Sequence, residues 1–409
     1  MSTKEKVYFP NLNGVRFIAA LGVIAHHIEQ NKNIYGLDNI YTNSFVGGVF
    51  GKLGIIMFFV LSGFLITYLL LKEKEKTGTI SIKHFYIRRI FRIWPLYYLI
   101  IAIGIFVLPH FSFFHIPYLS DHVNDHWGLK LFVFLFFLPN VADVLFRAAP
   151  APFINQTWSV GVEEQFYLMW PWIVKKSKNI LTVLLTIITV YFAIRTVFFV
   201  WHLKVPDNKV ISNINYFWEY FCIDDMSLGG IMAWILFNKK EKALKFLFNK
   251  YTQIITYLTL IFITVRGISV PFVTYEVYAI PFSVMIINLA ANKKTILSFD
   301  NPVLDYLGKV TYGLYMYHGI AIIFGVRAVM AWVPKDNLVL ANIVCYGITF
   351  GSCILMTVLS YELFENPFLK AKVKYSKIIS GDNAKQLVEE ENAAQPQELL
   401  ASTPVPSLP

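Results

Sequence analysis

Two ionisable side chains, Arg16 and His27, stand eleven residues apart in the first apolar stretch of the chain. At about 100° per residue they lie roughly 20° apart on one helix face, and roughly 16 Å apart along its axis. Ionisable groups inside a membrane span are costly, so each asks for an explanation. A cation followed by an imidazole, which exchanges protons near neutral pH, could bind an anion and move a proton. The alternative is an Arg reaching toward the headgroups and a His at the interface.

Two adjacent carboxylates, Glu163 and Glu164, follow Trp158 in another apolar stretch. Trp is typical of the membrane interface, so carboxylates that come later in the same span lie inside the bilayer. Consecutive helical positions face different directions. We therefore expect one carboxylate to face a cavity and the other to pair with Arg or Lys. A purely structural ion pair is the alternative.

A third polar group is the pair Arg89 and Arg92, spaced i, i+3 on one face of a helix at the expected cytoplasmic surface. Guanidinium groups bind phosphates through bidentate, charge-assisted hydrogen bonds, so the pair could hold a phosphorylated ligand. Binding of anionic lipid by a basic patch beside the membrane explains the pair equally well.

Two further residues could belong to a site. His318 lies inside another apolar stretch, where a satisfied interior His and a ligand-contacting His are both open. Ser62 precedes Gly63, and this small pair predicts a close approach of backbone or ligand.

One loop is rich in His and Asp, and in it His122 and His126 have the i, i+4 spacing of two metal ligands. No third ligand is defined, so we expect a solvated loop and no metal site. The other His and Asp residues of this loop are His110, His115, Asp121 and Asp125.

Composition identifies the class of protein that must position these groups. Of the 409 residues, 56% are hydrophobic and only 15% are charged, whereas a soluble protein needs about 25% charged residues to wet its surface. The net charge of +10 does not indicate nucleic-acid binding, because Lys and Arg cluster between apolar runs. The three Cys lie in apolar runs and predict no disulfide framework, and no cleavable signal peptide is evident.

The pattern predicts an all-α integral membrane protein with about ten transmembrane helices, each near the ~18 apolar residues that cross a bilayer. The apolar run Leu129–Leu138 is too short to cross alone and predicts a partial or re-entrant helix. The expected spans are 9–29, 46–71, 94–109, 155–174, 179–201, 217–237, 251–267, 274–291, 311–333 and 339–363.

Every second connection is rich in Lys and Arg, as in residues 72–92 and 239–250, which predicts cytoplasmic loops and two cytoplasmic termini. We expect a multi-pass protein of the inner (plasma) membrane, in contact with its lipid. Residues 1–375 are expected to form one membrane domain. The polar, acidic and Pro-containing segment 376–409 predicts a disordered cytoplasmic tail.

Several segments, taken in order, resemble the acyltransferase-3 family of bacterial membrane acyltransferases. The resemblance runs over roughly residues 9–368 and departs from the family at Asn13, where Asp is usual. It implies the stand-alone membrane form, without the hydrolase-like domain that some relatives append. The matching segments are Arg16-x10-His27, Phe58–Phe64, Arg89-x-x-Arg92 before Trp94-Pro95, Trp158–Tyr167, Asp225–Gly230, Tyr312–His318 and Glu365–Pro367.

The resemblance implies a transferase that moves an acyl group, usually acetyl, from cytoplasmic acyl-CoA to a hydroxyl of an extracytoplasmic acceptor. The acceptor would be a surface polysaccharide, a glycolipid or a similar molecule, acetyl-CoA would be the donor substrate, and no resident cofactor is implied. His27 would be the general base, Glu163 would orient a catalytic group, and an acyl-His intermediate is a variant.

By the same resemblance Arg89 and Arg92 would bind acyl-CoA, and Arg16, a further catalytic candidate, would bind the CoA end or hold the donor in line. Ser62, Glu164 and His318 are possible additional site residues. From the polar residues alone, a transporter or flippase for a small polar or lipid-linked solute competes with the enzyme. Transporters often contain inverted repeats, and we find none in this sequence.

Overall fold

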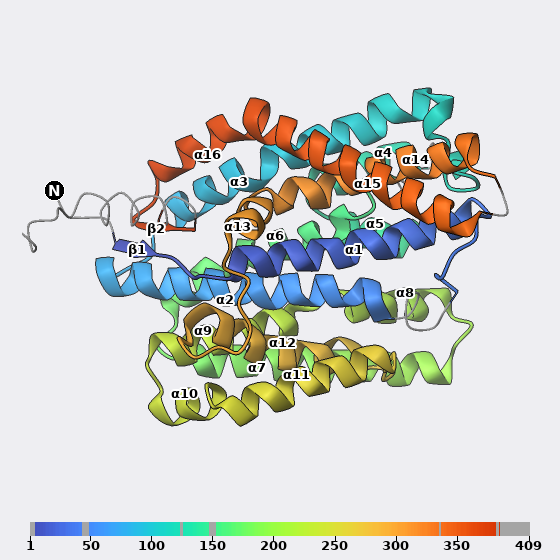
Figure 1. Ribbon diagram of the computed structural model, residues 1–409. Helices are drawn as coiled ribbons and strands as arrows, with labels where there is room; N and C mark the ends of the chain where they lie inside the picture. Colours follow the sequence, from blue (N-terminus) through green and yellow to red (C-terminus); the bar gives the residue numbers. More distant parts are fainter. Residues whose placement is uncertain are drawn as a thin grey trace, which may run out of the picture.

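The apolar stretches fold as helices, because a backbone inside a bilayer must satisfy its polar groups within its own segment. The computed structural model describes residues 5–42, 49–122, 126–146, 153–334, 337–381 and 384. Figure 1 shows long helices lying side by side in one bundle. In chain order they are α1 (Leu12–Ile34), α2 (Gly51–Thr77), α3 (Ile82–Ala102), α4 (Trp127–Leu135), α5 (Pro139–Phe146), α6 (Thr157–Lys176), α7 (Ile180–Lys204), α8 (Lys209–Tyr220), α9 (Ile223–Phe237), α10 (Glu241–Leu247), α11 (Lys250–Val265), α12 (Thr274–Ala291), α13 (Pro302–Lys309), α14 (Thr311–Trp332), α15 (Leu338–Ser360) and α16 (Asn366–Val373).

Each expected span contains a helix, but fewer than ten helices are clearly apolar. Within the described ranges, seven helices are long and apolar enough to cross a membrane, or eight if α10 and α11, bent by 55°, count as one span. Helices α1 and α6 do not pass this test, and they carry Arg16, His27, Glu163 and Glu164. Their polar residues lower the hydropathy of the very helices that hold the predicted site. The count of ten therefore stays a prediction.

Several expected spans have the wrong ends: α2 continues to Thr77 rather than 71, and the span expected at 217–237 is two helices, α8 and α9. α1 continues to Ile34 rather than ending near 29, because Lys32 pairs with Glu29 at 2.9 Å and Tyr346 donates to the same carboxylate at 2.9 Å. α3 begins at Ile82 rather than 94 and continues through Pro95. Its first half was missed in the sequence because that half is charged and its hydropathy is therefore low. The run from Leu129 forms only the nine-residue helix α4, as its length predicts.

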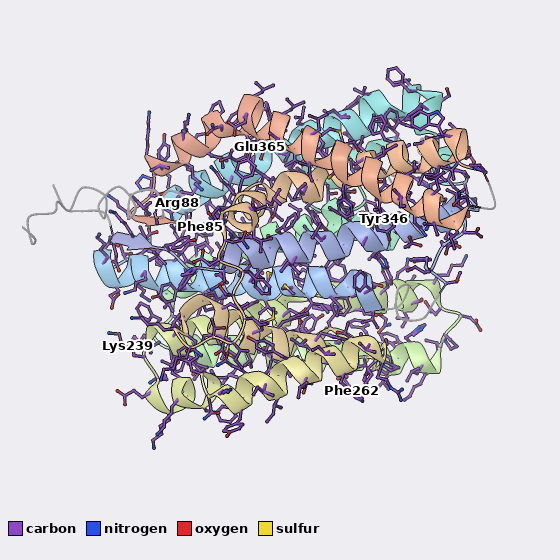
Figure 2. The ribbon with its side chains drawn as sticks, in the orientation of Figure 1. Phe85, Arg88, Lys239, Phe262, Tyr346 and Glu365 are labelled. Carbon is purple, nitrogen blue, oxygen red and sulfur yellow. The ribbon has the colours of Figure 1, made fainter. Side chains whose placement is uncertain are left out.

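The two ends of the bundle's chain meet in a small parallel sheet. Strand β1 (Glu5–Val7) pairs with β2 (Ile378–Ser380), with Glu5 opposite Ile378. The ordered chain therefore extends beyond the tail boundary predicted at 375, while 385–409 lie outside the described residues. Figure 2 shows Arg88, in the first half of α3, and Lys239, between α9 and α10, toward the end of the bundle that carries the strands. This grouping agrees with the prediction that the segments rich in Lys and Arg lie at one end of the bundle. That this end faces the cytoplasm stays a prediction.

Close helix packing in the centre depends on glycines. Gly63 of α2 faces the backbone of α9, and Gly229 of α9 faces the backbone of α2. A Cβ at Gly63 would collide with the Met226 carbonyl. A Cβ at Gly229 would likewise collide with the Val60 carbonyl. The close approach predicted at Ser62-Gly63 is therefore confirmed, and it is an approach between helix backbones.

Candidate active site

A cavity of about 220 Å³ lies between the helices that carry most of the predicted site residues. Its walls come from α1, α2, α3, α6 and α14. We call the end lined by α13, α16 and the strand segments around Val7 and Ser380 its mouth. Apolar side chains such as Phe58, Leu65 and Ile66 cover much of the wall. A narrow apolar space with a few polar groups suits a flexible chain that ends in a reactive group.

The mouth of the cavity is cationic. Arg16, Arg89 and Arg92 line it, together with Lys309 and Lys372. Arg89 also lies over the Tyr167 ring, with its guanidinium carbon 5.6 Å from the ring centroid. Five cations around one opening suit an anion that carries several phosphate groups.

Arg88 is excluded from this group although it neighbours Arg89 in the sequence. It pairs with Glu73 at 2.8 Å and donates to the Tyr375 carbonyl at 2.9 Å, away from the cavity. The i, i+3 spacing of Arg89 and Arg92 therefore identified the two guanidinium groups that share the cavity.

The Arg16 side chain is held by the residue that departs from the family pattern. Arg16 donates to the Asn13 side-chain oxygen at 2.6 Å, and the Asn13 amide donates to the Asp305 carboxylate at 2.8 Å. Position 13 lacks the carboxylate that is usual in the family, but Asp305 of α13 provides one nearby. The Asn13 amide lies between this carboxylate and Arg16. Asp305 has no motif in the sequence and becomes a candidate only through this contact.

Glu163 lines the cavity and lies at the end of a short hydrogen-bonded chain that has Tyr167 at its centre. Tyr167 donates to Glu163 at 2.9 Å and is hydrogen-bonded to Ser62. All three residues line the cavity. Tyr167 was not predicted, although its i+4 spacing from Glu163 on α6 places it on the same face.

Glu164 points elsewhere. It accepts a hydrogen bond from the Trp94 indole at 3.2 Å, and its other oxygen has no hydrogen-bond partner among the described residues. The expectation that one of the two carboxylates faces a cavity is confirmed for Glu163. The other carboxylate, Glu164, was expected to pair with Arg or Lys, and its hydrogen-bond donor in the described part of the chain is the Trp94 indole of the neighbouring helix.

The inner end of the cavity leads to two histidines. Tyr315 and Ser159 line that end and are hydrogen-bonded to each other at 2.7 Å. One turn further along α14, the His318 Nε2 atom lies 3.0 Å from the His27 Nδ1 atom. The two rings are stacked with centroids 5.0 Å apart. Neither His lines the cavity, whereas Arg16 does, so His27 lies past the end of the cavity that Tyr315 and Ser159 line.

The His-rich loop holds no evident metal site in the part that the structure describes. His115 is hydrogen-bonded to Asp121 at 3.1 Å, and no group of three or more His, Cys, Asp or Glu side chains is arranged around a common point there. Asp125 lies outside the described residues.

Comparisons with known proteins agree with the resemblance drawn from the motifs. The model of an acyltransferase domain, the acyltransferase-3 family, matches residues 9–360. A Staphylococcus aureus (strain COL) protein named "Putative O-acetyltransferase" is 28% identical over 400 residues, which cover 91% of this chain and 59% of that protein. The O-acetyltransferase OatA of S. aureus (strain NCTC 8325) is 26% identical over 392 residues, covering 90% of this chain and 58% of that protein.

A third relative is the peptidoglycan O-acetyltransferase OatA of Listeria monocytogenes, 34% identical over 169 residues, which cover 41% of this chain and 24% of that protein. The chain thus spans about three fifths of the length of the relatives that it matches along most of its own length. No solved structure matches. Because the family model covers most of the chain, this multi-pass membrane protein belongs to the acyltransferase-3 family.

Proposed function

We propose that the protein is a membrane O-acetyltransferase of the inner membrane, which takes acetyl from cytoplasmic acetyl-CoA and passes it to a hydroxyl on an extracytoplasmic glycan. The observation that carries this proposal is the cavity, which is cationic at its mouth and reaches Tyr315, one turn of α14 from the His27–His318 pair. A phosphate-rich donor would sit at the mouth, with its thioester arm along the apolar wall.

The reaction is a transfer from thioester to ester. The acceptor oxygen bonds to the acyl carbon, the carbon–sulfur bond breaks, and the hydroxyl proton passes to His27. The departing thiolate takes up one proton, so that the products are an ester and the free CoA thiol. A positioned imidazole typically contributes about 10²–10⁴-fold to such a step.

The other predicted residues take roles along the donor's path. Arg89 and Arg92, with Lys309 and Lys372, would bind the phosphates of CoA. Arg16 would hold the donor where the mouth meets the apolar wall. Glu163, through Tyr167 and Ser62, would keep a polar point midway along the cavity.

The acceptor class rests on the relatives. Two are named O-acetyltransferase OatA, and one of these is named as acting on peptidoglycan. We therefore propose a cell-envelope polysaccharide as acceptor. The competing transport function would require a solute path through the bundle, and the family membership favours transfer chemistry.

The test is ester-linked acetate in the cell envelope, released by mild base and compared between cells with and without the protein. His27→Ala should lower it at least tenfold while the protein still accumulates in the membrane. His26→Ala is the matched control: His26 packs against Tyr41 with ring centroids 5.5 Å apart and edge-on against His27 at 5.3 Å, so this variant removes a neighbouring ring and leaves the His27–His318 contact. Normal acetate levels with His27→Ala would exclude His27 as the base.

A further inference from the structure

The contact between the two histidines joins helices far apart in the sequence, and it has a defined direction. The His318 Nδ1 atom lies 2.6 Å from the Tyr315 carbonyl oxygen. A carbonyl oxygen can only accept a hydrogen bond, so Nδ1 of His318 carries the hydrogen. A neutral imidazole has a single N–H, which leaves its Nε2 atom as an acceptor.

The neutral form of His318 is the one that its surroundings favour. The side chain is only 2% exposed, and burying an imidazolium without a counter-charge would be costly. The hydrogen in the 3.0 Å contact must then come from His27, whose Nδ1 atom donates to His318 Nε2. His27 therefore keeps its own Nε2 atom without a hydrogen.

We infer that His318 is a positioning residue for His27: it holds the His27 ring in the tautomer whose Nε2 atom is free to take the acceptor's proton. This inference rests on the proposed function, in which His27 is the base. A base oriented by a third group through its other ring nitrogen is a general arrangement for activating a hydroxyl.

The turn that carries His318 is itself rigidly placed. Gln156 donates to the Met316 carbonyl at 2.9 Å, and Tyr315 donates to the Gln156 carbonyl at 3.1 Å. A Cβ at Gly319 would lie 2.9 Å from the Phe153 carbonyl oxygen, so α14 packs directly against the segment that precedes α6. On the other side, Asn31 donates to the His27 carbonyl at 2.8 Å. The backbone that carries each of the two rings is therefore held in place by hydrogen bonds or close packing.

His318 differs from the carboxylate of a Ser-His-Asp triad, because it is neutral. It can orient His27 and accept its N–H in both protonation states, but it provides no negative charge to stabilise the imidazolium. Residues that hydrogen-bond the second ring nitrogen of a metal-ligating histidine, and so fix its orientation, typically contribute about 10–100-fold to metal affinity or activity. We expect an effect of that size on kcat and little effect on the KM for acetyl-CoA, whose proposed site lies at the other end of the cavity.

Two variants separate positioning from packing. His318→Phe keeps a stacked ring and removes the acceptor, whereas His318→Gln places an amide oxygen near the former Nε2 position. With purified protein in lipid nanodiscs, acetyl-CoA and soluble peptidoglycan fragments, His318→Phe should lower kcat about 10–100-fold and change KM less than twofold. His318→Gln should recover much of the loss. An unchanged kcat with His318→Phe, or no recovery with His318→Gln, would overturn the inference.

A second readout needs no activity. Nitrogen-15 NMR of histidine-labelled protein distinguishes the two imidazole tautomers, and the His27 signal can be assigned by its loss in His27→Gln. Wild-type His27 should carry its hydrogen on Nδ1 and shift toward the Nε2–H form in His318→Phe. A hydrogen on Nε2 in the wild type would refute the inference even if that variant failed to fold. Full activity of His27→Ala would instead refute the proposed base and leave the tautomer measurement standing.

Discussion

The sharpest test of the cationic mouth compares three neighbouring arginines on α3. Arg88→Gln, Arg89→Gln and Arg92→Gln each remove one positive charge from the same part of one helix, so their long-range effects on an anionic ligand are similar. Only Arg89 and Arg92 line the cavity, whereas Arg88 pairs with Glu73. Differences in ligand affinity among the variants therefore report direct contact.

The expected size follows from the contact that is lost. A hydrogen bond between charged groups is worth about 1.5–3 kcal/mol. With 1.4 kcal/mol for each factor of ten, Arg89→Gln or Arg92→Gln should raise the Kd for acetyl-CoA by roughly 10–150-fold. Arg88→Gln should change it less than about threefold, because exposed charges beyond contact distance are screened by salt. That variant should instead lower thermal stability, since it leaves the 4%-exposed Glu73 carboxylate without its cation.

The assay is calorimetric titration of the protein in nanodiscs with two ligands, acetyl-CoA and S-acetylpantetheine. The second ligand keeps the thioester arm and lacks all phosphates. Its affinity should be weak and equal for wild type, Arg89→Gln and Arg92→Gln. Equal acetyl-CoA affinity for Arg88→Gln and Arg89→Gln, or an equal loss with both ligands, would refute phosphate recognition by this face of α3.

Two further predictions concern the wall of the cavity and the helix packing behind it. Glu163→Gln keeps an acceptor for Tyr167 but removes the charge, and should lower the rate of acetyl transfer about tenfold or more, measured as thiol release from acetyl-CoA with glycan fragments. Glu164→Gln, whose side chain bonds Trp94, should retain most of that rate, and equal losses would contradict a special role for Glu163. Gly63→Ala should lower the melting temperature of the purified protein, because the new Cβ would meet the Met226 backbone. Gly22→Ala on α1 has no atom within 4 Å of its new Cβ and should be neutral or stabilising, so a matching loss there would contradict the packing argument.

Much of the site followed from the local pattern. Helical spacing paired Arg89 with Arg92 on one face, and it put Glu163 and Glu164 on different faces. The structure agrees with both. These predictions succeeded because a helix repeats its geometry every few residues, so the spacing of two residues determines whether their side chains lie on the same face.

The partners of these residues could not be predicted in the same way. Glu164 meets Trp94, and Asn13 joins Arg16 to Asp305 across nearly three hundred residues of sequence. The ends of α1 were also misplaced, because Lys32 and Glu29 neutralise each other in the interior. Hydropathy counts each charge as if it stood alone and cannot include a partner from another helix.

Taken alone, the sequence determined that the chain crosses a membrane, which polar residues stand inside it, and that Arg16 and His27 share a face of α1. Their helical spacing and the cost of charge in lipid follow from composition and local geometry. Only the tertiary structure placed Arg16 in the lining of a cavity and His27 outside that lining, and paired His27 with His318 at 3.0 Å. The reason is that hydrogen-bond direction and cavity shape depend on how α1, α6 and α14 pack, and helical periodicity carries no information about a neighbour's register.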